Sequence, residues 1–204
     1  MTQWVYNFGK STTDGNSSLQ NLLGGKGANL AEMSGIGLPV PPGFTISTKV
    51  CTHFYDHEKT YHDALDQQVR SSIAKIEAET ETAFANPVNP LLVSVRSGAR
   101  ASMPGMMDTV LNLGLNDATA AGLAIKANDV RFAYDSYRRF IQMYGDVVMG
   151  VDHGLFEDAL EDMKRERGLI NDTDLTGDDM MALVVIYKDL VMDEVDTPFP
   201  QDPW

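Results

Sequence analysis

The sequence predicts an α+β protein, in which a mixed α/β subdomain is followed by a mostly helical subdomain. Up to about residue 114, short β-rich runs alternate with stretches of helical periodicity and are separated by turns rich in glycine and proline. After that point the hydrophobic patterns are helical only. We therefore assign residues 1–114 to the first subdomain, residues 115–195 to the second, and residues 196–204, which include three prolines, to an extended tail.

Hydrophobic period and turn chemistry place the elements of the first subdomain. Alternating, β-rich residues at 4–8 predict a first strand, and Ser47 or Thr48 can cap a helix that follows a second one. Apolar residues at positions 65–84 recur mostly three, four or eight residues apart, as expected of an amphipathic helix. The expected strands are 4–8, 44–47 and 91–95, and the expected helices begin near Lys26, begin near Thr48 and span 65–84.

The second subdomain is expected to contain four helices, of which the first is rich in alanine. Arg138 and Arg139 are adjacent on the second of these, so their side chains point about 100° apart and need not share a role. Thr176 and Asp179 have the spacing of a capping box, which predicts where the last helix begins. The expected helices are 117–127, 129–148, 155–167 and 177–192.

Charge and composition exclude several classes of protein. The net charge of −13 is concentrated in residues 151–204, with 15 acids and 4 bases, whereas residues 1–150 hold 14 acids and 12 bases. This acidic end argues against a nucleic-acid partner. No apolar run is long enough to span a membrane, and the N-terminus lacks a signal or transit pattern. The single cysteine, Cys51, excludes an internal disulfide and fits a reducing compartment, so we expect a cytoplasmic protein.

Residues 94–113 hold the first candidate site. A short apolar strand ends before Arg96 and Arg100, which stand among small residues, and Gly105 follows in a turn. Such a segment can hold an anion, because its backbone N–H groups can approach a phosphate closely and a guanidinium donates two charge-assisted hydrogen bonds. The residues alone leave a second interpretation open, namely a surface loop with two solvated arginines.

A second candidate anion site surrounds Lys26, which stands among three glycines at the predicted start of a helix. A helix N-terminus presents free N–H groups and the positive end of the helix dipole, and a lysine adds to this field. The spacing of a P-loop is missing. A plain flexible turn is the alternative interpretation.

No catalytic triad or metal motif can be argued from the remaining residues. His53 and His57 lie four residues apart on one predicted helix, with Glu58 next to them, and such a pair can bind zinc. Ordinary surface histidines explain the same pattern, and we favour them. Cys51 is expected to fill space rather than to act as a nucleophile. We therefore assign no metal ligand.

Four segments resemble one family. They are similar, in register over essentially the whole chain, to the N-terminal region of the pyruvate, phosphate dikinases. The run Ser-Met-Pro-Gly-Met-Met-Asp-Thr at 102–109 is specific for that family. The similar segments are Gly-Gly-Lys-Gly-Ala-Asn-Leu-Ala-Glu-Met at 24–33, Gly-Leu-Pro-Val-Pro-Pro-Gly-Phe at 37–44, Ser-Val-Arg-Ser-Gly-Ala-Arg at 94–100 continuing to 112, and Tyr-Arg-Arg-Phe-Ile-Gln-Met-Tyr at 137–144 with 151–156.

The resemblance implies an incomplete ATP-grasp nucleotide-binding domain. By motif, Lys26 would contact the phosphates of ATP, Arg96 would stabilise charge on the transferring phosphoryl group as the catalytic residue, and Arg139 would be a further base that faces the phosphates. This agrees with the chemistry of the two loops, because phosphoryl transfer depends chiefly on positioning and on neutralising oxygen charge. The loop that closes over the phosphates would include Ser102, Met103 and Gly105.

The resemblance also implies what accompanies this domain. In the family, it gives the β-phosphoryl group of ATP to a histidine on a separate domain, phosphate accepts the γ-phosphoryl group, and a TIM barrel then phosphorylates pyruvate. ATP and Mg²⁺ are thus the implied cofactors, AMP, phosphate and diphosphate the further ligands, and a homodimer the implied complete enzyme. The acids that hold Mg²⁺, the phosphohistidine motif and the pyruvate barrel have no counterpart here, so we expect a truncated domain that is inactive alone.

Two alternatives remain open. Phosphoenolpyruvate synthases and water dikinases share the glycine–lysine loop and the Ser-Val-Arg-Ser opening, but they differ in the loop that follows. A function of another class is a stand-alone, non-catalytic module that binds an anion or a protein partner.

Overall fold

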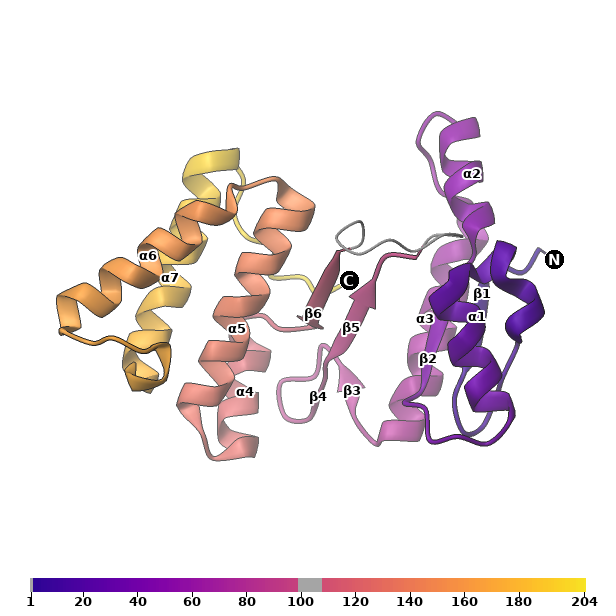
Figure 1. The fold of residues 1–204 in the computed structure, drawn as a ribbon, viewed down its shortest axis with the longest axis horizontal. Coiled ribbons are helices and arrows are strands. Elements are labelled where there is room, and N and C mark those ends of the chain that lie inside the picture. Colours follow the sequence, from indigo (N-terminus) through magenta and orange to yellow (C-terminus); the bar gives the residue numbers. More distant parts are fainter. Residues whose placement is uncertain (1, 99–107) are drawn as a thin grey trace. The chain divides into compact units, whose positions relative to one another are not determined.

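A computed structural model of the 204-residue chain describes residues 2–98 and 108–204. These residues form two compact units, and each is described by itself (Figure 1). The first unit holds residues 2–82 with 97 and 98, and the second holds residues 83–96 and 108–204. Among the described residues, no helix has both the length and the apolar character that a membrane span requires.

The first unit is a small antiparallel sheet covered by helices. Strand β1 (Val5–Phe8) pairs with β2 (Gly43–Ile46), so that Val5 lies opposite Ile46. Helix α3 (Asp63–Thr80) contacts both strands, as does helix α1 (Gln20–Gly35). Helix α2 (Thr48–Asp56) follows β2, and a short 3₁₀ helix, η1 (Ser17–Leu19), precedes α1.

A hydrogen-bonded glutamine ties the start of the chain to α3. The Gln68 side-chain oxygen accepts hydrogen bonds from the backbone N–H groups of Trp4 and Val5, at 2.8 and 3.1 Å. Both residues are buried, and they form one hydrophobic cluster with Val50 of α2 and Leu65 of α3. The first strand is therefore held both by apolar packing and by a polar contact from the helix that covers it.

The second unit combines two short strand pairs with a helical layer. Strand β3 (Ala83–Phe84) pairs with β4 (Pro90–Leu91) in parallel, and β5 (Val93–Arg96) pairs with β6 (Thr109–Leu113) in antiparallel. The helices are α4 (Asp117–Ala127), α5 (Val130–Tyr144), α6 (His153–Arg167) and α7 (Gly177–Val195), with a π-helical turn η2 (Gly145–Met149) after α5 and a 3₁₀ turn η3 (Asp172–Asp174) before α7.

Helix α5 lies at the centre of this unit, where it contacts α4, α7 and β6. Its residues Tyr137 and Ile141 are fully buried, together with Phe156 of α6 and Tyr187 of α7. The rings of Phe156 and Tyr187 meet edge to face at 5.0 Å, and the Tyr187 hydroxyl donates to the Phe156 carbonyl at 2.9 Å. Burial raises the pKa of Tyr187 to about 12, so the hydroxyl stays protonated in this core.

The last residues pack against the helical layer. Residues 197–204 form no helix or strand, but Phe199 is buried against the rings of Tyr137, Phe140 and Tyr144. The Gln201 side chain donates to the Tyr137 hydroxyl at 3.1 Å. The segment that the sequence predicts as an extended tail is thus part of the hydrophobic core of the second unit.

The mixture of helices and small sheets agrees with the predicted α+β class. The expected subdomain boundary at residue 114 differs from the division between the units, because the strands at 83–96 pack with β6 and the helices of the second unit. Strands β3, β4 and β6 were not expected from the sequence. The helix expected at 129–148 ends at Tyr144, and the chain continues as the π-helical turn.

Candidate functional site

Gly24 interrupts helix α1 just before Lys26. Its backbone angles, φ 71° and ψ 168°, lie in a region that is essentially restricted to glycine. Helix α1 therefore consists of two segments, and Lys26 lies in the first turn of the second, as the sequence predicts. The first turn of a helix offers N–H groups that have no acceptor within the helix, together with the positive end of the dipole.

Helix α1 packs closely against β2 at Gly27, whereas the preceding residue, Lys26, lies on the surface. The neighbouring Gly27 is buried, and a Cβ atom there would lie 2.6 Å from the Thr45 hydroxyl oxygen, so this contact requires glycine. Lys26 itself is exposed, and its ammonium group has no ion pair or hydrogen bond within residues 2–98 and 108–204. The lysine is thus available to an external anion.

Arg96 lies at the end of strand β5. The strand pairs Arg96 with Thr109 at the start of β6, so the arginine is positioned where the chain enters the connection between the two strands. An irregularity in the register between Val93 and Val95 precedes it. The Arg96 side chain is exposed. The strand pair therefore fixes the backbone of this residue while its guanidinium remains accessible.

Arg96 differs from every other arginine that the structure describes, because no described residue forms an ion pair or a side-chain hydrogen bond with it. The others contact a carboxylate or a backbone carbonyl, which fixes their side chains and neutralises or screens their charge. Those contacts are Arg70 with Asp66, Arg131 with the carbonyls of Asp172 and Leu175, Arg138 and Arg139 with Asp135, Arg165 with Asp162, and Arg167 with Asp179.

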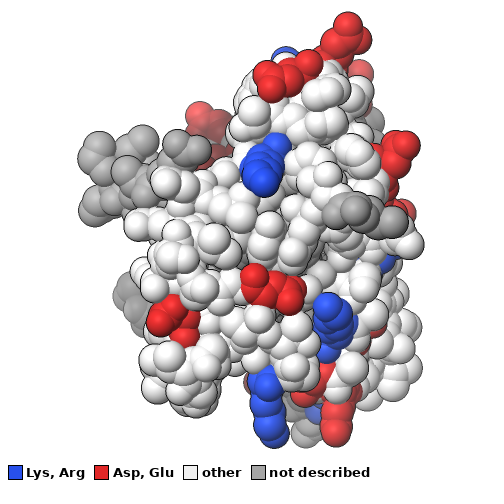
Figure 2. All heavy atoms as spheres, turned by 90° about the vertical axis from the view of Figure 1, so that its right-hand side faces the viewer, with Lys and Arg blue, Asp and Glu red and all other residues white. Residues whose placement is uncertain are grey.

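The face of the molecule that Figure 2 shows has no broad basic surface. The Lys and Arg side chains there stand apart from one another, separated by uncharged surface and by acids. A polyanion would need neighbouring cations along its length. Anion binding on this face would thus depend on individual residues in a defined local setting.

Three further residues of the expected site, Ser102, Met103 and Gly105, lie outside the described residues, as does Arg100. In the sequence they all belong to the connection between β5 and β6.

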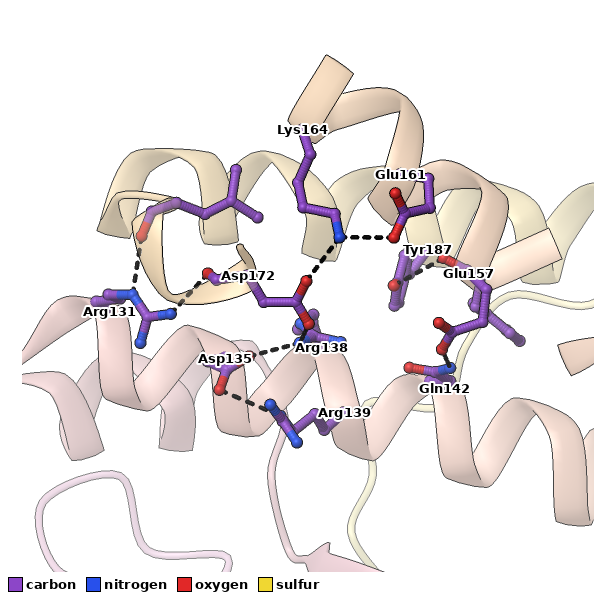
Figure 3. A network of polar contacts seen from close by, with 12 residues as sticks. Arg131, Asp135, Arg138, Arg139, Gln142, Glu157, Glu161, Lys164, Asp172 and Tyr187 are labelled. Carbon is purple, nitrogen blue, oxygen red and sulfur yellow. Dashed lines mark hydrogen bonds and ion pairs between the residues drawn. The ribbon is translucent and has the colours of Figure 1, made fainter. Parts of the chain in front are cut away.

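Adjacent arginines on α5 differ in burial, although both contact Asp135. Arg138 is 3% exposed and binds Asp135 at 2.9 Å, whereas Arg139 is exposed and donates through Nε to the other oxygen of Asp135, at 3.1 Å. Figure 3 shows the Arg139 guanidinium pointing away from the layer that contains Lys164. Because Asp135 contacts only Nε, the edge formed by the two terminal nitrogens has no partner among the described residues.

Behind Arg138, a chain of ion pairs joins α5 to α6 and η3 (Figure 3). Asp172 lies 3.9 Å from Arg138 and 2.9 Å from Lys164, and Lys164 also contacts Glu161 at 2.6 Å. The hydrogen bond from Lys164 holds the pKa of Asp172 below its usual value, and Glu161 and Asp172 raise the pKa of Lys164. Arg138 is thus buried between two acids, Asp135 and Asp172, which indicates a structural role for it.

The described residues contain no group of three or more histidine, cysteine, aspartate or glutamate side chains that could hold a metal ion. His53 and His57, the pair considered for zinc, stack face to face with ring centroids 3.9 Å apart. Stacked rings do not direct their nitrogens to one point. His57 follows the last residue of α2 as its C-cap, and its Nδ1–H group donates to the His53 carbonyl oxygen, at 2.9 Å.

Comparison with known sequences decides the family. The family model described as "Pyruvate phosphate dikinase, AMP/ATP-binding domain" matches residues 20–134, more than half of the chain. The chain belongs to the pyruvate, phosphate dikinase family. Pyruvate, phosphate dikinase 1, chloroplastic, from Oryza sativa subsp. japonica is 55% identical over 199 residues. The enzymes from Rhizobium meliloti (strain 1021) and Zea mays (pyruvate, phosphate dikinase 2) are 53% and 54% identical over 203 and 202 residues.

These alignments cover nearly all of the chain but little of each relative. They include 98–100% of this chain and 21–23% of the three pyruvate, phosphate dikinases. The chain thus spans about a fifth of the length of the dikinases that it matches. The family model covers both Lys26 and Arg96, and Arg139 lies beyond its end.

Sequence reasoning missed two features of this dikinase-family chain. Asp135 bridges the two arginines of α5, and an acid three and four residues before two bases is a recognisable signal for such a contact. His62 lies close to His53 and Trp4, and no local spacing connects these residues. Only the folded chain brings Trp4 close to the end of α2 and the start of α3.

Proposed function

We propose that this chain binds the phosphates of ATP as part of the ATP-binding domain of a pyruvate, phosphate dikinase. The observation that carries the proposal is that residues 20–134, which match an AMP/ATP-binding domain, include Lys26 and Arg96, two cations that form no ion pair with the described residues. An unpaired surface cation at a helix start and another at a strand end fit phosphate oxygens, since neither has to break an internal contact.

The proposed roles follow from the chemistry of the two side chains. Lys26 supplies a point charge beside the N–H groups of the second segment of α1, and Arg96 offers a planar fork that can bind two phosphoryl oxygens and stabilise the charge of the transferring group. Arg139 contributes its free edge while Asp135 holds its Nε atom. In this proposal Ser102, Met103 and Gly105 form the loop that closes over the phosphates.

The reaction proposed for the longer enzyme is the conversion of ATP, pyruvate and phosphate to AMP, phosphoenolpyruvate and diphosphate through a phosphohistidine. In this scheme the chain belongs to an ATP-grasp domain. The described residues offer no acidic cluster for Mg²⁺, so we derive no step through a metal in this chain. Without metal ions to neutralise the phosphates, the 204-residue chain should bind ATP weakly and be inactive alone.

Calorimetric titration with ATP, AMP and pyrophosphate, with and without Mg²⁺, tests this function. Lys26→Met and Arg96→Met should each weaken ATP binding about 10- to 100-fold, as expected for the loss of a charge-assisted hydrogen bond. Lys49→Met and Arg165→Met, which remove exposed cations outside the site, should leave it unchanged.

Binding that is unaffected by either site variant would refute the assignment of the phosphate contacts. Tight ATP binding that depends on Lys26 would refute only the expectation that residues outside this chain are required. Formation of phosphoenolpyruvate by this chain alone would refute the proposal that it is inactive.

A further inference from the structure

Three histidines and a tryptophan of the first unit form one ring cluster that the proposed function does not use. His53 on α2 stacks on His57, with ring centroids 3.9 Å apart and planes inclined by 24°. His62, the N-cap of α3, lies 5.6 Å from His53. Trp4 contacts both His53 and His62, at 5.5 and 5.4 Å. The cluster therefore joins the start of the chain to the end of α2 and the start of α3.

These rings provide much of the packing at this end of α2, which rises away from strands β1 and β2 in Figure 1. Val50 is the only buried residue of α2. Farther along, Phe54 stacks on Tyr61 at 4.8 Å, and both Glu58 and Lys59 adopt left-handed backbone angles, with φ of 52° and 60°. Such angles are unfavourable for residues other than glycine, asparagine and aspartate. The turn at 57–62 is thus held by ring contacts against backbone strain.

The hydrogen bond that His62 accepts requires a neutral imidazole. His62 Nδ1 accepts a hydrogen bond from the Ala64 N–H group at 3.1 Å, which caps α3 and needs an unprotonated nitrogen. An imidazolium at that position would have no lone pair to offer and would place a positive charge at a helix N-terminus. Stacked His53 and His57 cannot both carry a charge without strong repulsion at this distance.

We propose that His53, His57 and His62 form a proton-sensitive latch, which holds the end of α2 and the 57–62 turn on Trp4 when the rings are neutral and releases them on acidification. Protonation breaks the cap of α3, introduces repulsion within the stack and removes both ring contacts to Trp4. The released segment, from His53 to His62, exchanges its amide protons faster, while the sheet and α1 remain folded.

The surroundings of the cluster determine whether the pKa of His53 is raised or lowered. Burial, and then His57 and His62, lower the pKa of His53 from the usual 6.5, whereas Asp56 opposes this shift. The turn adds Glu58 and Lys59, α3 adds Asp63 and Asp66, the latter paired with Arg70, and the described residues before Trp4, Thr2 and Gln3, carry no side-chain charge. No charged group of α1 acts on His53 within the described part of the chain.

The sign of the pH dependence follows from this lowered pKa. The folded chain binds the His53 proton less readily than the unfolded chain, so the stabilisation by the cluster is complete above pH 6.5. It is lost as the pH falls through the pKa of the folded state. Acidification from pH 8 should therefore leave the latch closed until the pH drops below about 6.5.

Trp4 provides a local probe of the latch. In a Trp204→Phe background, Trp4 is the only tryptophan of the chain, and its fluorescence reports whether the histidine rings remain packed on the indole. Titration from pH 8 to pH 5 should change the Trp4 fluorescence with a midpoint below 6.5. The individual histidines are followed in parallel by NMR of their ring protons, and amide hydrogen exchange is measured at the two ends of the titration.

Two cluster variants and one control separate the latch from a general effect of pH. His57→Gln removes a like charge next to His53, so the His53 midpoint should rise toward 6.5. His53→Gln should abolish most of the fluorescence change. His153→Gln, which alters a histidine of the second unit, should leave the His53 midpoint and the fluorescence change as they are in the wild type. If His53→Gln fails to fold, the exposed His57 variant still provides the test.

Three results would overturn the proposal. They are a His53 midpoint at or above 6.5, a His53 midpoint that His57→Gln does not move, and amide exchange in residues 53–64 that does not accelerate relative to the rest of the unit when the cluster is protonated. A midpoint below 6.5 that rises in His57→Gln, together with accelerated exchange confined to that segment, would support it.

Discussion

Replacing Gly24 by alanine tests whether the interruption of α1 places Lys26 at a helix start. At φ 71° and ψ 168° an alanine side chain is strained by about 1–3 kcal/mol. Alanine also lowers the conformational entropy of the unfolded chain, which stabilises the folded state by about 0.4–1 kcal/mol. We therefore expect a net loss of about 1–2 kcal/mol in the free energy of unfolding, together with weaker ATP binding, because relief of the strain would move the turn that carries Lys26.

Gly25→Ala is the matched control, because it adds the same methyl group at the next position. Gly25 lies within the helix, and its Cβ atom would meet only the Gln20 side-chain nitrogen, at 3.5 Å. Alanine should raise the free energy of unfolding by about 0.5–1 kcal/mol at a helical position. Urea unfolding, followed by Trp4 fluorescence in a Trp204→Phe background, measures both variants. Equal stability of the two variants would refute the reasoning, since it would mean that the interruption does not depend on Gly24.

Three further predictions concern the second unit. Gly122→Ala should lower the free energy of unfolding by about 3 kcal/mol or more, since its Cβ atom would lie 1.4 Å from the Pro87 carbonyl oxygen and the backbone must move; an unchanged melting temperature would contradict this. Phe199→Ala should lower the free energy of unfolding, measured by thermal melting, by about 3–5 kcal/mol, whereas a change near zero would mean that the last residues are not part of the core. Hydrogen bonds from Thr176 lower the pKa of Asp179 from 3.8 to about 2, so its stabilisation should be complete above pH 3.8 and lost as the pH falls toward 2. Urea midpoints measured across this range should fall in the wild type more than in Asp179→Asn, and equal slopes would disprove the assignment.

Local sequence signals predicted the long helices well. The helix expected at 117–127 matches α4, because an alanine-rich run follows Asn116, which caps it with a capping box. The box predicted at Thr176 and Asp179 opens α7 as expected. Both contacts connect residues three apart, so the sequence contains all the information that they require.

Structure that depends on distant partners was not predictable in the same way. Strand β6 lies within the stretch interpreted as a loop, and it becomes a strand because it pairs with β5. Strands β3 and β4 have two residues each, too few to show a period. The burial of Arg138 depends on Asp172, which lies far along the chain beyond α6. For the site, the sequence identified Lys26 and Arg96 as cations in small-residue settings, whereas only the structure shows that neither forms an ion pair with another described residue.

The distribution of ion pairs explains how an acidic chain can serve as an anion-binding one. All four bases of residues 151–204 contact acids within the fold, so this acidic end has no free cation to offer. A paired cation binds a phosphate only after its internal contact is broken or shared, which weakens the net interaction. By this reasoning Lys26 and Arg96 should contribute most to phosphate binding. Arg139 should contribute less, because Asp135 already accepts from its Nε atom. The pairs in the acidic segment are Lys164 with Glu161 and Asp172, Arg165 with Asp162, Arg167 with Asp179, and Lys188 with Asp117. Within the matched AMP/ATP-binding region, Lys49, Lys59 and Lys75 also lack an ion pair among the described residues, so the setting of Lys26 at a helix start and of Arg96 at a strand end is what distinguishes these two cations.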